Sequence, residues 1–238
     1  MFLIWLPKNR PLRVTCQVLY SGYMPSKTPG HGASQDHHHE MSLDDTYQFL
    51  NTLELESGSL VDRFATFDDA AAWLIGRGVC HEDLGPAALA ASGVTEREAL
   101  DKVRSVRGAL REVAHAVSED RPPEDAALAE VNRAIASRER IELVRAPDGV
   151  SVGHSHVGDP LDDALARLAD PLVREIQSGR SERVRVCDNE TCRWIFFDES
   201  RGGQRRWCDM ASCGNRAKAA RHRARAKAKA TGAANTAA

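Results

Sequence analysis

Two short stretches decide the fold of the C-terminal part of the chain: CDNETCRWIFF at residues 187–197 and RRWCDMASC at residues 205–213. They place Cys187 and Cys192 in one pair and Cys208 and Cys213 in another, with four residues inside each pair and fifteen between the pairs. Zn²⁺ binds four thiolates tetrahedrally, and each short loop can supply one edge of that tetrahedron. We predict one structural Zn²⁺, because four protein ligands leave no open position for catalysis. The alternative is four unrelated buried cysteines.

The segment between the two pairs predicts a hairpin. The apolar run 194–197 is typical of a strand, Gly202-Gly203 suits a turn, and residues 205–207 lead back towards the metal. The second pair stands at the start of a helix, whose dipole favours a thiolate at Cys213. These features are typical of a treble-clef-like zinc module. The sequence carries no convincing signal peptide, which indicates a reducing, cytoplasmic location where paired thiols more often bind metal than form disulfides.

The residues after Asn215 predict a basic helix. Seven lysines and arginines occur between residues 216 and 229 with no acidic residue among them, and alanine, the strongest helix former, fills most of the gaps. No large apolar residue follows Asn215, so this helix lacks the apolar face needed to dock on the protein or to lie in a membrane surface.

The charge of the chain is asymmetric. The 238 residues carry a net charge of −2, but residues 1–179 carry −10 and residues 180–238 carry +8. A basic tail on an acidic body indicates a polyanionic partner, and we expect double-stranded DNA. The alternatives are an RNA- or protein-binding interaction module, a basic surface that pairs with the acidic body, and a plain solubility tail. A palindromic DNA site would require a homodimer.

The candidate nucleic-acid-binding residues fall into two groups. Arg and Asn side chains can read guanine and adenine in the major groove, whereas cations on the helix can neutralise phosphates. Residues on the ordered module are assigned to base edges: Arg205, Arg206, Asn215 and Arg216. Residues farther along the helix are assigned to phosphates: Lys218, Arg221, Arg223 and Arg225.

The acidic body is predicted to be mainly helical. Helix starts are indicated at Ser42, Thr66, Pro86, Thr95 with Glu98, Pro122-Pro123 and Asp159-Pro160. Pro171 is expected to kink or split the last of these helices. The one clear hairpin signal joins residues 140–144 to 150–154 through Pro147-Asp148-Gly149. The fold class is therefore mainly α with a β-hairpin (α+β).

Arginines recur along the long predicted helix. Arg104 and Arg107 are spaced to line a cleft and to hold a small anionic effector, with Asn51 and Thr52 orienting it. The alternative is ordinary ion pairing with nearby acids. No nucleophile motif, P-loop, dinucleotide fingerprint or metalloprotease motif occurs in the sequence, so we do not expect an enzyme.

The run Cys213-Gly214-Asn215-Arg216, with the stretches around Cys192–Arg201 and 205–207, resembles the CGNR zinc finger. The stretch Phe49–Thr52 and the Arg104–Arg107 helix resemble ABATE, the domain that precedes this finger in its family. The resemblance implies a transcription regulator. In the finger's turn, Gly202-Gly203 departs from the polar residues usual there, and Gln48 stands where an acid is commoner.

These observations predict four parts. Residues 1–41 form an extension of little order, and residues 42–179 form an ABATE-like helical domain. Residues 180–230 form the CGNR-type zinc finger with its basic helix, and residues 231–238 form a flexible tail. No run of apolar residues is long enough to span a membrane.

Overall fold

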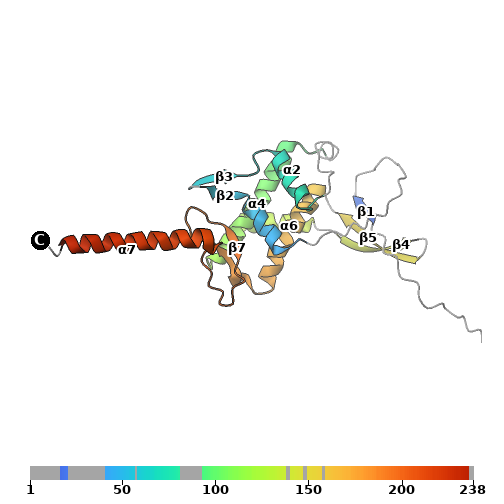
Figure 1. The fold of residues 1–238 in the computed structure, drawn as a ribbon. Helices are drawn as coiled ribbons and strands as arrows, with labels where there is room; N and C mark the ends of the chain where they lie inside the picture. The colour runs from blue at the N-terminus through green and yellow to red at the C-terminus, as the bar shows by residue number, and fades with distance from the viewer. Residues whose placement is uncertain are drawn as a thin grey trace, which may run out of the picture.

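The computed structural model describes residues 17–20, 41–56, 58–80, 93–137, 140–146, 149–156 and 159–235. Its body is a group of helices in which α4 (Glu96–Ser118) packs against α1, α2, α5 and α6 (Figure 1). The remaining helices of the body are α1 (Leu43–Leu50), α2 (Phe67–Gly76), α5 (Asp125–Ala136) and α6 (Pro160–Gln177). The predicted helical body is therefore confirmed, and the helix indicated at Pro86 lies outside the described residues.

Local capping sets where four of these helices begin. Ser42, Thr66, Thr95 and Asp159 each accept a hydrogen bond from the backbone N–H three residues later, and the acidic side chain of that later residue accepts one from the backbone N–H of the cap. Such capping boxes satisfy backbone donors that a helix start leaves without partners. Helix α5 lacks a side-chain cap and begins at Asp125, after the predicted Pro-Pro start.

The core lies along one face of α4. An apolar stripe along α4 is buried at Val103, Val106, Leu110 and Val113, while its outer members Leu100 and Val117 are partly buried. This face packs on the apolar sides of α1 and α6. Three aromatic rings, Phe49, Phe64 and Trp73, fill one end of the core with centroids 5.8–6.2 Å apart.

Helix α6 does not end at Pro171. It runs from Pro160 to Gln177 as one helix, so the expectation that Pro171 splits it is wrong. Leu168 and Leu172, on either side of the proline, are fully buried in the core. Their burial offsets the backbone hydrogen bond that proline cannot make. The helix ends at Gln177, two residues before Gly179, which has a φ of +75° that glycine adopts readily.

The described strands form three small sheets. The predicted hairpin is present as β4 (Arg140–Ala146) antiparallel to β5 (Gly149–His156), and β1 (Gln17–Tyr20) adds to β5 in parallel. Strand β1 lies within the segment 1–41, which was predicted to have little order, so four residues of that segment join a sheet. A second hairpin, β2 (Leu53–Glu56) with β3 (Ser59–Asp62), was not predicted.

The third sheet joins β6 (Val184–Val186) to β7 (Ile195–Phe197). Its buried residues Val184, Val186 and Ile195 belong to the same core cluster as the helical body. The segment that carries the cysteines is therefore built onto the body through a shared core. Within the described residues, no helix is both long and apolar enough to cross a bilayer.

Candidate metal centre and nucleic-acid interface

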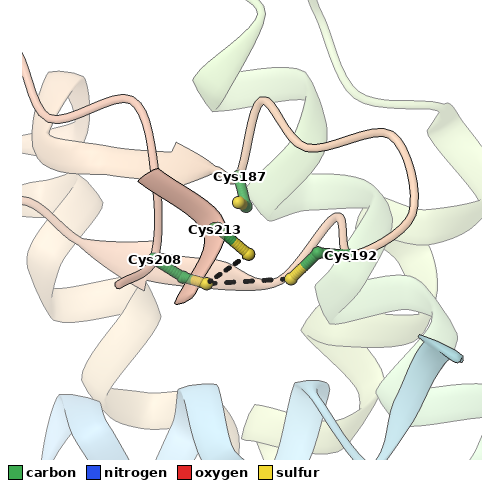
Figure 2. Close-up of side chains that lie close together, drawn as sticks. All are labelled: Cys187, Cys192, Cys208 and Cys213. Carbon is green, nitrogen blue, oxygen red and sulfur yellow. Dashed lines mark hydrogen bonds between the residues drawn. The ribbon is translucent and has the colours of Figure 1, made fainter. Parts of the chain in front are cut away.

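Four cysteine side chains converge on one point (Figure 2). The sulfurs of Cys187, Cys192, Cys208 and Cys213 all lie within 4.8 Å of one another. The Cys192–Cys208 and Cys208–Cys213 sulfur distances are 3.7 and 3.8 Å. A tetrahedron with Zn–S bonds of about 2.3 Å has edges of about 3.8 Å. The four sulfurs therefore fit a tetrathiolate Zn²⁺ site, and an ion held there stabilises the local fold.

Short backbone turns orient these thiols towards one another. Cys187 follows β6 and donates its backbone N–H to the Trp194 carbonyl (2.8 Å), while Cys192 donates to the Asn189 carbonyl (2.8 Å) and closes the first loop. The second pair ends in a single π-helical turn, η2 (Met210–Gly214), whose first N–H groups are capped by Asp209. Helix α7 (Asn215–Asn235) begins two residues after Cys213, which confirms the predicted helix start.

Polar side chains donate to one sulfur of the cluster. Asn189 Nδ2 lies 3.3 Å and Arg216 Nη2 lies 3.1 Å from Cys213 Sγ. Burial raises the pKa of the Cys213 thiol, but these two donors outweigh burial, and the net pKa shift is downward. Hydrogen bonding with Cys208 likewise lowers the pKa of Cys187 to about 5. Cys187 is thus prepared as a thiolate, and the pKa of Cys213 is shifted in the same direction.

The other two thiols are held in the protonated form when no ion is bound. Burial raises the pKa of Cys192 to about 11. The pKa of Cys208 is raised mainly by its hydrogen bond to Cys187, with burial and the neighbouring thiolates adding to the effect. A metal ion would displace these protons, because only the thiolate is a zinc ligand.

The turn after β7 is organised by Asp198. Its buried carboxylate accepts from the backbone N–H groups of Ser200 (2.9 Å) and Arg205 (2.7 Å). With its N–H held by Asp198, Arg205 does not pair with β7, and the expected hairpin between residues 194–197 and 205–207 is wrong. The partner of β7 is β6, which precedes the first cysteine.

The arginines beside the metal site make contacts inside the module. Arg205 donates to the Trp207 and Cys208 carbonyls and stacks over Phe196. Arg206 pairs with Asp188 at 2.5 Å and stacks over Trp207, although its side chain remains 63% exposed. Asn215 donates to the Ala211 carbonyl at the start of α7. Base reading by these residues and Arg216 stays a prediction; Arg206, Asn215 and Arg216 are exposed, whereas Arg205 is half-buried.

Helix α7 carries the free cations. It runs away from the body of the molecule (Figure 1), and every residue from Lys218 to Arg225 is exposed. Among the residues the structure describes, no acidic side chain pairs with Lys218, Arg221, Arg223 or Arg225. The structure thus places these four predicted phosphate-binding residues together on one projecting element, attached at its base to the metal centre.

Several hydrogen bonds join the module to the body, among them those from the Val186 N–H to Ser118 Oγ (3.1 Å) and from Arg193 Nη2 to Glu119 (3.4 Å). Asn51, just after α1, donates to the Ile195 carbonyl (2.8 Å) and accepts from the Ile195 N–H (2.9 Å), closing the free edge of β7. Trp194 Nε1 donates to Glu54 of β2 (3.1 Å). Neither the pairing of Asn51 with Ile195 nor that of Trp194 with Glu54 could be predicted from the sequence, because the partners stand about 140 residues apart and belong to no local motif.

The predicted effector residues form an internal network. Arg107 is buried and binds both carboxylate oxygens of Asp62 (2.8 and 2.6 Å) and the Thr52 hydroxyl (2.8 Å). Arg104 donates to the Phe64 carbonyl and lies 3.2 Å from Asp62. The structure brings three of the four residues together around Asp62, whereas Asn51 faces the zinc module instead. The roles of Asp62 and Asn189 could not be predicted from the sequence, since single polar residues form no recognisable spacing pattern.

A four-cysteine module that carries a basic helix and shares its core with a helical body defines a zinc-finger protein. The model for the CGNR zinc finger matches residues 183–226. The model for ABATE, described as "Putative stress-induced transcription regulator", matches residues 47–178, more than half of the chain, so the protein belongs to the ABATE family. The family resemblance is confirmed, and the four cysteines lie close enough together to fit the one structural Zn²⁺ that was predicted. A comparison with curated proteins found no match.

Proposed function

We propose that the protein binds double-stranded DNA through its zinc module and α7, and that it regulates transcription by doing so. The observation that carries the proposal is α7: an exposed helix with cations, no acids and no apolar face, fixed at its first turn to a metal centre. Cations on such a helix bind phosphates and release counterions, which makes affinity depend on salt. A cytoplasmic protein associated with the nucleoid follows from this proposal.

The first experiment measures duplex DNA binding by fluorescence anisotropy at several salt concentrations. We expect the Arg221→Ala, Arg223→Ala, Arg225→Ala triple variant to bind more weakly and to lower the salt slope by about 2.7, since each phosphate contact contributes about 0.9. The matched control replaces three exposed arginines of the body, Arg97, Arg133 and Arg145, with alanine. This control removes the same charge and should leave the slope unchanged.

Two results would overturn the proposal. One is absence of duplex binding by the zinc-loaded chain at low salt. The other is an equal loss of affinity in the α7 and control variants, which would reduce the effect to net charge. Competition between duplex DNA and structured RNA tests the RNA alternative, and a protein partner retained after nuclease treatment would favour the protein-binding alternative.

Sensing of a small anionic effector by the helical domain is a separate proposal. An anion at Arg107 would have to displace Asp62, which already occupies the guanidinium. The Asp62→Asn variant should therefore gain affinity for inorganic phosphate or sulfate in a calorimetric titration if this site accepts anions. No heat of binding in either protein would remove the effector site from the proposed function.

A further inference from the structure

The cations of α7 lie in two opposite rows. A helix turns about 100° per residue, so Arg223 stands within about 20° of Arg216 around the helix axis. Lys218, Arg221 and Arg225 stand about 140–200° away from Arg216, on the opposite side.

Alanines occupy the two faces between these rows. Ala217 and Ala224 stand about 80–100° from Arg216, and Ala219 and Ala226 stand about 280–300° from it. The helix therefore has two charged edges, one flat face of small side chains at Ala217 and Ala224, and a second face on which His222, about 240° from Arg216, borders the alanines. A tail that only increased solubility would need the positive charge but no particular arrangement of it. In α7 the cations and the alanines instead stand at different positions around the helix axis.

We propose that α7 lies lengthwise in the major groove of B-form DNA, with one row of cations on the phosphates of each strand. The proposal rests on the proposed function and specifies its ligand and geometry. An α-helix with side chains is about 10–12 Å across, and the major groove of B-DNA is about 12 Å wide. A helix that fills this groove meets a phosphate backbone on each of two opposite sides, which is where the two rows stand.

The alanine faces complete the fit. One of them faces the groove floor, where small side chains let the helix sit deep and where alanine contacts the thymine methyl group. The rows from Arg216 to Arg225 extend over about 14 Å of helix, or about four base pairs. This length is short enough for a straight helix to stay within the curving groove. Duplex RNA presents a deep, narrow major groove that does not admit the helix.

The test keeps the charge and moves it around the helix. The register variant combines Arg223→Ala with Ala224→Arg and Arg225→Ala with Ala226→Arg, which rotates two cations by about 100° onto the alanine faces. Composition and net charge are unchanged, and both residue types are strong helix formers. The control variant, Arg223→Lys with Arg225→Lys, keeps both cations in their rows. Helicity and zinc content are measured for each protein.

We expect the register variant to lose at least about tenfold in affinity for duplex DNA at about 0.1 M salt, and the control to stay within about threefold of the parent chain. The parent chain should bind duplex DNA more tightly than an RNA duplex of the same sequence. Replacing thymine by uracil, which removes the methyl group, should weaken binding.

A footprint on the parent chain tests the groove without any substitution. Dimethyl sulfate methylates guanine N7 in the major groove and adenine N3 in the minor groove, and we expect protection of N7 alone. Parent-like binding by the register variant, protection at adenine N3, or equal affinity for duplex RNA would overturn the groove geometry while leaving DNA binding intact. Failure of the parent chain to bind any duplex DNA would instead overturn the proposed function.

Discussion

At the residue scale, Asn51 closes the exposed edge of β7. Its amide is the hydrogen-bond partner of both the N–H and the carbonyl of Ile195, whose side chain is buried in the shared core. An edge strand otherwise leaves these backbone groups without partners. The side chain predicted to orient an effector is thus placed to hold the zinc module on the body, and its own amide groups are already used.

Replacing Asn51 should therefore act on stability. The Asn51→Ala variant leaves two buried backbone groups without partners, which we expect to lower the free energy of unfolding by about 2–4 kcal/mol. Urea unfolding of the zinc-loaded chain measures this change. The matched control is Asn132→Ala on the exposed face of α5, expected to change stability by less than about 0.5 kcal/mol. If Asn51→Ala changed the free energy of unfolding as little as the control does, the pairing of Asn51 with Ile195 would not contribute to stability.

At the element scale, two cysteine thiols of the zinc module carry protons that a metal ion must displace when it binds. Cys192, whose pKa is raised to about 11, and Cys208, whose pKa is also raised, are protonated near neutral pH. Zinc affinity should rise with pH, and the logarithm of the binding constant should climb by at least about two per pH unit between about pH 6 and 8. Competition with a chelator of known protonation measures the slope. A flat profile would show that all four thiols are already ionised without metal.

Elements set by local chemistry could be predicted from the sequence, and elements set by distant partners could not. The capping residues at Ser42, Thr66 and Thr95 act within one turn, and the cysteine spacing fixes a closed loop, so both were predictable. The choice of β6 as the partner of β7 depends on Asp198, which occupies the N–H of Arg205, and on burial of Val184 in the body. Neither effect leaves a periodic pattern in the sequence.

At the scale of the whole molecule, the predicted boundary near residue 180 does not separate two cores. Val184, Val186 and Ile195 of the finger are buried with the side chains of α4 and α1. Because Cys187 directly follows β6 and Cys192 stands three residues before β7, an ion bound by both would hold the two ends of this small sheet together. The stability of the folded zinc module and the stability of the helical body are therefore linked.

Removal of zinc should consequently loosen the body as well as the finger. We expect chelation to raise amide hydrogen exchange in β6, β7 and the facing residues of α1 and α4 together, and to lower the melting temperature of the whole chain in one transition. Hydrogen-exchange mass spectrometry measures each segment, and re-addition of Zn²⁺ should restore protection in all of them. Exchange that increases only in residues 187–213, while α1 and α4 keep their protection, would show that the finger folds as an independent unit.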